Sequence, residues 1–291
     1  MLASQEIEFL EKTAKNVRQN ILRMIHAAKS GHPGGSLSGA DILTVLYTKS
    51  LNIPSKWDKD ENFENRDRFI LSKGHASPLL YSVLAEIGMF PKEELLTFRK
   101  INSKLQGHPS RGYLPGIEAS TGSLGQGLSL ACGIAMALKL DKKTANVFVY
   151  LGDGELQEGS CWEAFMQANH RNLDNLVAII DRNKLQIDGC TEDVMALGNV
   201  ADKIRSFGWE VIEIDGHDYN QIFTRDDYEH IKEKMTGEKK QQFFFINPLT
   251  TEAEDLILSM DFNALAERNT ATPGFGKGDF VSYYSELKNL T

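Results

Sequence analysis

Cysteine is scarce in this sequence, and long apolar runs are missing from it. The three cysteines, Cys132, Cys161 and Cys190, are odd in number and widely spaced, which excludes a disulfide framework or a zinc site built from closely spaced pairs. No apolar run approaches the length of a membrane-spanning helix, and the charged N-terminal stretch has no apolar signal-peptide core. We therefore expect free thiols in a reducing cytoplasm.

Basic residues are fewer than acidic residues, 32 against 40. The net charge is −8 and the pI is about 5.5, which argues against a nucleic-acid partner and against binding to an anionic membrane surface. Apolar residues make up 41% of the 291 positions. That is enough for the core of one large α/β domain or of two smaller ones.

The most informative stretch lies in the middle of the chain. An apolar run over 147–151 ends at Gly152-Asp153-Gly154, a helical segment follows over 158–171, and a second apolar run over 176–180 ends at Asp181-Arg182-Asn183. This order predicts a parallel βαβ unit. Ligands of open α/β sheets bind at the carboxyl ends of the strands, so we expect a carboxylate and a carboxamide to meet there.

Asp153 and Asn183 offer the hard oxygen donors that Mg²⁺ or Ca²⁺ prefers. The glycines on either side of Asp153 let a diphosphate approach the backbone closely. The stretch therefore predicts a site for a divalent cation and a diphosphate. The alternative is an ordinary strand–turn–helix whose turn residues are merely polar.

Helices and strands are expected to alternate along the whole chain. Helices are predicted over 5–29, 39–50, 78–87, 124–139, 158–171, 198–207, 226–234 and 251–265, and strands over 68–72, 147–151, 176–180, 209–214 and 243–246. This alternation predicts an α/β fold with a doubly wound parallel sheet and helices on both faces. The helix at 124–139 follows a glycine turn directly, so its N-terminus is expected to bind an anion.

Three histidines stand apart from the other four. His32, His75 and His108 each follow a glycine, in a turn or at a strand end, where the ring can point into a cleft. Imidazoles in such places can act as acids, bases or neutral hydrogen-bond donors near pH 7. The remaining histidines are interpreted as structural or exposed; they are His26, His170, His217 and His230.

Four blocks of sequence carry a family resemblance. They are SGHPGGSLSGADIL, LSKGHASPLLYSVL, GHPSRG…IEASTGSLGQGLSLACGIAMALKL and GDGELQEG…DRNKLQIDG, and from about residue 10 to 220 they resemble the amino-terminal, diphosphate-binding domain of transketolases in content and order. The resemblance implies a thiamine-diphosphate-binding domain over 1–250. Residues 251–291 are expected to form a C-terminal helix and tail that diverge from the family.

The resemblance also implies roles for individual residues. Asp153, the Asn183 side chain and the Leu185 carbonyl would hold the metal, Mg²⁺ or Ca²⁺. His32 and His108 would meet the donor substrate as catalytic residues. The cofactor would be bound by His75, Gly122, Ser123, Leu124, Asp153, Gly154, Asn183 and Glu158, the last resembling a glutamate at the family's subunit interface.

Part of a transketolase site is not found in this chain. The glutamate and aromatic residues that activate thiamine diphosphate belong to the family's following, pyrimidine-binding domain, before which this chain ends. The resemblance thus implies one subunit of a split transketolase-like transferase. With a second chain, as a heterotetramer of two plus two, it would move a two-carbon ketol or acyl unit from a ketose or 2-oxo acid donor to an acceptor.

The C-terminal part departs from the family pattern. Transketolases carry a Lys-Gly-Lys-Gly segment and then a His-Gly after the last strand, whereas no histidine follows His230 here. This leaves open whether the usual sugar-phosphate donor is kept, and the sequence fixes neither acceptor nor pathway. Two alternatives remain: a component of a thiamine-diphosphate-dependent decarboxylase or dehydrogenase, and a non-catalytic paralogue that binds or regulates a partner.

Overall fold

The computed structural model describes residues 2–54, 57, 63–222 and 242–246, the last stretch by its backbone alone. Within this described part, no helix has the length and apolar character needed to cross a membrane. The predicted helices at 226–234 and 251–265 lie outside the described residues. So does the predicted domain boundary at residue 250.

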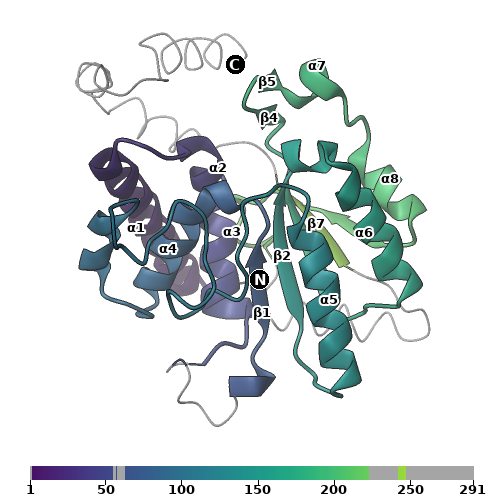
Figure 1. Ribbon diagram of the computed structural model, residues 1–291, viewed down its shortest axis with the longest axis horizontal. Helices are drawn as coiled ribbons and strands as arrows, with labels where there is room; N and C mark the ends of the chain where they lie inside the picture. The colour runs from purple at the N-terminus through teal and green to yellow at the C-terminus, as the bar shows by residue number, and fades with distance from the viewer. Residues whose placement is uncertain (1, 55–56, 58–62, 223–241, 247–291) are drawn as a thin grey trace.

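The fold is built on a parallel sheet (Figure 1). Its strands are β1 (Arg68–Leu71), β2 (Val147–Gly152), β3 (Leu176–Asp181), β7 (Gln242–Ile246) and β6 (Glu210–Glu213), in that spatial order. Every neighbouring pair is parallel. All carboxyl ends therefore lie at one edge of the sheet, as the sequence predicted.

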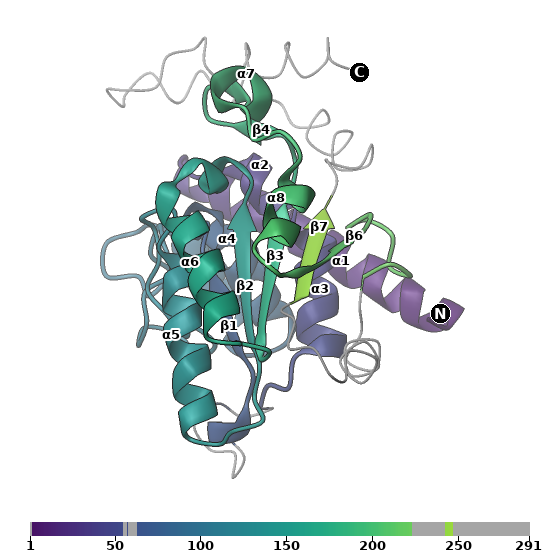
Figure 2. The same cartoon turned by 90° about the vertical axis from the view of Figure 1, so that its right-hand side faces the viewer.

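Helices cover both faces of the sheet (Figure 2). On one face α1 (Ser4–Ala28), α3 (Ala40–Val45) and α4 (Ser77–Glu86) share a buried cluster with Phe148 and Tyr150 of β2. On the other, α5 (Gly127–Leu140), α6 (Gly159–His170) and α8 (Val200–Ser206) pack on Val147, Val149 and Leu151. Successive strand residues point to opposite faces. A strand buried on both faces is therefore apolar throughout, and the prediction of a doubly wound sheet is confirmed.

Two predicted helices differ most from the observed bounds. The predicted helix at 39–50 is α3 followed by a π-helical turn, Leu46–Ser50, and it is preceded by the short helix α2 (Pro33–Leu37). The predicted helix at 124–139 begins only at Gly127. Gly122 and Gly125 hold φ angles of +150° and +82°, which keep the chain out of the helical region there. The glycine turn therefore does not lead directly into α5, and the predicted helix start at residue 124 is wrong by three residues. The anion site expected at that helix end stays a prediction.

Several short elements were not predicted. The hairpin of β4 (Leu185–Gln186) and β5 (Gly189–Cys190) and the helix α7 (Thr191–Met195) lie beyond the sheet edge where β2 and β3 end (Figures 1 and 2). The 3₁₀ turns are Phe63–Asn65, Gly74–Ala76, Lys92–Thr97 and Gly154–Gln157. The turns Gly74–Ala76 and Gly154–Gln157 closely follow β1 and β2, so these two lie at the carboxyl edge of the sheet together with the hairpin.

A buried polar cluster fixes the loop after β6 to the helices beneath it. Asp41, at the start of α3, accepts hydrogen bonds from Arg18, from Tyr219 Oη at 2.5 Å and from His217 Nδ1 at 2.8 Å. Burial alone would raise the pKa of Asp41, but hydrogen bonds from His217 and Arg18 outweigh it and lower the pKa to about 2. Burial would likewise lower the pKa of His217, and the Asp41 carboxylate reverses this and raises it. His217 is thus a structural residue.

This cluster predicts a pH window of stability. Asp41 contributes above about pH 4, its ordinary range, and loses its contribution as pH falls toward its folded pKa of about 2. His217 contributes fully below its unfolded pKa of about 6.5 and loses its contribution as pH rises through its raised folded pKa. In urea titrations His217→Asn should cost about 2 kcal/mol near pH 6 and less above the raised pKa. His170→Asn, at an exposed position, is the control, and equal losses at all pH values would contradict the assignment.

Candidate cofactor site at the carboxyl edge

Asp153 is the buried acid at the end of β2. Its side chain is 1% exposed. The Oδ1 atom accepts from Gly154 N at 2.9 Å, and Oδ2 accepts from Lys184 N at 2.6 Å and from Arg182 Nη1 at 3.0 Å. The bond to Lys184 joins the turn after β3 to the turn after β2. The structure therefore brings the two predicted strand ends together.

Opposing effects act on the pKa of Asp153. Burial raises the pKa of its carboxyl group, the nearby Asp181 raises it further, and the hydrogen bond from Arg182 lowers it. The net direction is upward. A second positive charge near Asp153 would therefore relieve the cost of keeping this buried carboxylate ionised.

Arg182 is a site residue that the sequence patterns did not reveal. Besides Asp153, its guanidinium donates to Thr191 Oγ1 at 2.9 Å and to Glu192 Oε1 at 2.8 Å. It thereby ties α7 to the end of β3. Its position at a strand end between Asp181 and Asn183 could have indicated that it pairs with Asp153, the acid at the end of the neighbouring strand.

Asn183 and Leu185 lie on the same turn. Asn183 Oδ1 accepts from Leu185 N at 2.9 Å, and the neighbouring Lys184 amide reaches Asp153. Among the described residues no three His, Cys, Asp or Glu side chains gather as a metal site. The predicted set has one carboxylate, one amide and one backbone carbonyl. Such a set leaves positions for diphosphate oxygens on a hard cation, so these residues fit a metal that is bound together with a diphosphate.

Three glycines shape a backbone cradle beside Asp153. A Cβ placed on Gly74 would lie 2.8 Å from Gly122 N, one on Gly122 would lie 3.1 Å from the His108 ring, and one on Gly154 would lie 2.9 Å from Gln186 Cβ. No side chain fits at these points without displacement. Ser123 is exposed and Leu124 half-buried next to the cradle. The loops that carry Gly74, Gly122 and His108 are therefore in contact with one another, and Gly154 contacts the hairpin residue Gln186.

Glu155, the residue after Gly-Asp-Gly, holds these loops together and was not predicted either. Its buried carboxylate accepts from Ser72 Oγ at the end of β1, from Gly125 N at 2.9 Å and from Gly152 N at 3.1 Å. Burial raises its pKa, and the bond from Ser72 opposes this. The exposed Glu158 lies on the outer side of the glycine turn, where a Cβ on Gly125 would come within 2.7 Å of it.

The three predicted histidines form one group. The rings of His32 and His75 are edge to face with centroids 5.1 Å apart, and His108 packs on Gly122. Burial, then the charge of Lys73, lowers the pKa of His75 to about 3. Burial, then Arg99, also lowers the pKa of His32 and of His108. All three rings are therefore neutral at pH 7.

A buried ion pair between Lys73 and Asp181 lies next to this group of histidines. Lys73 is 2% exposed and Asp181 0% exposed, and Lys73 Nζ donates to Asp181 Oδ2 and to Gly35 O at 2.9 Å. Ser38 donates to the same carboxylate oxygen. The pair connects the end of β3 to the segments that carry His32 and His75.

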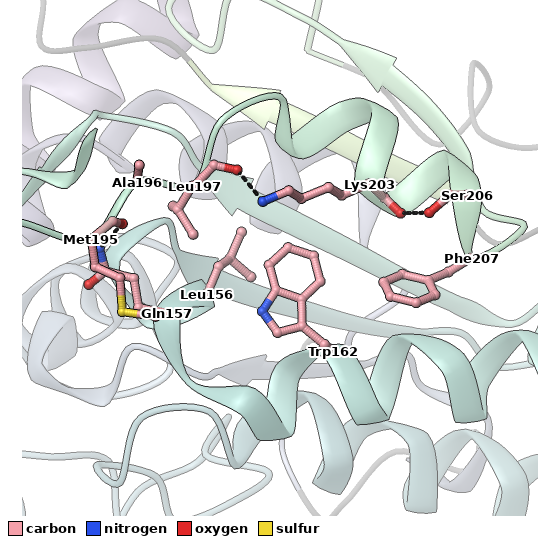
Figure 3. A pocket seen from close by; sticks show the side chains of 9 residues that line it. All are labelled: Leu156, Gln157, Trp162, Met195, Ala196, Leu197, Lys203, Ser206 and Phe207. Atoms are coloured by element: carbon pink, nitrogen blue, oxygen red, sulfur yellow. Dashed lines mark hydrogen bonds between the residues drawn. The ribbon is translucent and has the colours of Figure 1, made fainter. Parts of the chain in front are cut away.

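The structure also has a separate surface pocket, which does not contain the predicted site residues. It has a volume of about 300 Å³ and lies between α6 and α8, with Trp162 and Phe207 on its walls (Figure 3). Its lysine, Lys203, donates to Leu197 O at 2.7 Å. The residues that line it include no carboxylate and no histidine.

A parallel α/β sheet with a buried acid, a glycine cradle and neutral histidines at its carboxyl edge is the framework of a cofactor-dependent enzyme. Residues 10–235 match the family described as transketolase, thiamine diphosphate binding domain, and the chain belongs to this family. It is one subunit of a transferase of the transketolase type.

Two relatives match over most of their length. The chain is 43% identical over 217 residues to a subunit of the apulose-4-phosphate transketolase of Phocaeicola vulgatus, covering 75% of this chain and 76% of that one. It is 41% identical over 221 residues to the 6-deoxy-6-sulfo-D-fructose transketolase subunit SqwG of a Clostridium species, covering 76% and 79%. Both relatives are subunits by name, as the resemblance implied.

Longer relatives match through their first part. Human transketolase is 41% identical over 221 residues, 75% of this chain but 34% of its own. Solved transketolases from Leishmania mexicana and Pichia stipitis superpose with TM-scores of 0.72 and 0.74 at 27% and 29% identity, covering 100% and 97% of this chain. The chain spans less than half of the length of these two structures, 46% and 44%.

Proposed function

We propose that this chain binds the diphosphate half of thiamine diphosphate together with Mg²⁺. It forms an active split transketolase with a second chain that carries the pyrimidine-binding domain. The observation that supports this best is the Lys184–Asp153 hydrogen bond, which joins the two strand-end turns beside the glycine cradle. When bound, thiamine diphosphate supplies the electron sink for breaking a carbon–carbon bond next to a carbonyl.

The chain's own residues divide into two groups. Asp153, the Asn183 amide and the Leu185 carbonyl hold the metal, and Arg182 helps to orient the carboxylate. The diphosphate side is lined by His75, Gly122, Ser123, Leu124 and Gly154. Glu158, exposed at the start of α6, meets the neighbouring chain.

His32 and His108 act on the donor substrate. Neutral imidazoles can each donate one hydrogen bond and accept another, so the pair can orient the hydroxyl and carbonyl groups of a ketose. They can also carry a proton to or from these groups. The pKa of each ring is lowered by burial and by Arg99, which favours the neutral form that can accept a proton or a hydrogen bond.

The substrate we propose is a ketose with an anionic group. One relative is named for a sugar phosphate and the other for a sulfo sugar, so a phosphate or a sulfonate is the favoured class. The two-carbon ketol unit passes from this donor to an aldehyde acceptor. A 2-oxo acid donor is the alternative that the same assay tests.

The assembly we propose is a heterotetramer of two copies of each chain. The subunit names of the relatives support the need for a partner, and the exposed Glu158 supports an interface at the start of α6. We propose a cytoplasmic location, in line with three free cysteines.

Calorimetry with thiamine diphosphate and Mg²⁺ tests this function. The chain is titrated alone and after mixing with the product of the neighbouring reading frame. We expect weak binding alone, tight binding in the mixture, and ketol transfer in the mixture only. Turnover by the purified chain alone would contradict the split arrangement. No binding in either case would favour a non-catalytic paralogue, and CO₂ release from a 2-oxo acid without an acceptor would favour a decarboxylase.

A further inference from the structure

Arg99 lies in an unusual turn at the edge of the histidine group. The turn follows the 3₁₀ helix Lys92–Thr97, and Arg99 holds a left-handed φ of +59°. Its backbone N–H donates to Leu105 O at 2.9 Å, which fixes this conformation. A non-glycine residue in the left-handed region is strained and is found disproportionately where the strain serves a function.

The side chain of Arg99 contacts two segments that are far apart in the sequence. Its Nη1 donates to Ser30 Oγ at 2.5 Å, and a Cβ placed on Gly107 would lie 3.0 Å from its Nε. Ser30 is two residues before His32, and Gly107 is the residue before His108. One planar guanidinium thus lies against both histidine segments.

The electrostatics agree with this placement. After burial, the charge of Arg99 is the main influence that lowers the pKa of His32 and of His108. The other titratable groups of the cluster are His75, whose ring contacts His32, and Lys73 behind it. Arg99 is therefore the nearby cation that acts on both rings.

We propose that Arg99 is a positioning residue that joins the Ser30–His32 and Gly107–His108 segments into one two-histidine receptor for the donor ketose. This inference rests on the proposed function, because it assigns the receptor a substrate. Arg99 itself does not need to touch the substrate. Its planar guanidinium sets the spacing of the two rings, and its charge adds to burial in favouring the neutral form, which can accept a hydrogen bond.

Two variants separate charge from shape. Arg99→Met removes the charge and the hydrogen bond to Ser30, and Arg99→Lys keeps the charge but loses the planar fork. Arg171→Met, at an exposed position after α6, removes the same charge on the other side of the sheet and is the matched control. Circular dichroism and urea unfolding check that each variant folds.

The first readout is the pH titration of the histidines in the chain alone, which NMR of the isotope-labelled imidazole rings monitors. We expect Arg99→Met to raise the pKa of both His32 and His108, and Arg99→Lys and Arg171→Met to leave both near their wild-type values. This readout needs neither cofactor nor partner, so it stands if the proposed function fails. Unchanged titration of both rings in Arg99→Met would overturn the inference.

The second readout is the pH profile of kcat/KM of the complex with the partner chain, with a phospho-ketose as donor. Arg99→Met should raise KM at least tenfold and move the acidic limb of the profile to higher pH. Arg99→Lys should keep the limb in place and still raise KM, because the spacing of the rings is lost. An active complex in which both variants have wild-type KM and pH profile would overturn the inference while leaving the proposed function intact.

Discussion

Asp153→Asn is expected to lower the affinity for thiamine diphosphate and Mg²⁺ at least 100-fold, or about 2.7 kcal/mol. The substitution removes the carboxylate of the predicted metal set and places an NH₂ group among donors. At least one of the three groups that Asp153 now accepts from, Gly154 N, Lys184 N and Arg182, must then lose its partner. Calorimetry of the chain with cofactor and Mg²⁺, alone and with the partner chain, measures the loss.

The loss of stability in Asp153→Asn must be distinguished from the loss of a metal ligand. The unpaired donors around residue 153 should cost the apo chain about 1–3 kcal/mol, which urea unfolding without cofactor reports. Asp188→Asn removes the same charge at an exposed position of the nearby hairpin and should bind normally. If folded Asp153→Asn binds cofactor and metal like the wild type, Asp153 is not a metal ligand and the site lies elsewhere.

The sequence predicted the parts of this site that depend on local order. Strand ends can be read from apolar runs, and parallel strands bring their carboxyl ends to one edge. Asp153 and the turn after β3 were therefore expected to meet, and the Lys184–Asp153 hydrogen bond shows that they do. The three histidines His32, His75 and His108 were grouped because each follows a glycine in a turn or at a strand end, and the ring contact of His32 with His75 agrees with this.

The residues that the sequence did not predict share a physical cause. Glu155 bonds to Gly125, thirty residues earlier, and Lys73 pairs with Asp181, 108 residues later. Arg99 reaches back 69 residues to Ser30. Such partners are chosen by the packing of loops, and apolar periodicity carries no information about them. The shifted start of α5 has a similar origin, because it depends on positive φ angles and on the close approach of Gly127 to Ser72.

Lys73→Met is expected to be the most destabilising of the variants considered, at about 3–5 kcal/mol. It leaves Asp181 as a negative charge in the core, with Ser38 as its remaining side-chain donor. Removing one partner of a buried pair costs far more than the pair contributes, because the remaining charge is neither solvated nor matched. Urea unfolding of the apo chain at pH 7 gives the free energy of unfolding directly.

The exposed pair Lys139–Asp174 provides the matched control. Lys139→Met should cost about 0.5 kcal/mol or less, since exposed pairs are screened by water and salt. The double variant Lys73→Met with Asp181→Asn should lose less free energy of unfolding than the two single variants lose together, because it leaves no unmatched charge. A Lys73→Met loss as small as that of Lys139→Met would mean that water reaches the pair. In that case Lys73 could not fix the segments that carry His32 and His75, and the spacing of these rings would depend on Arg99 and on loop packing alone.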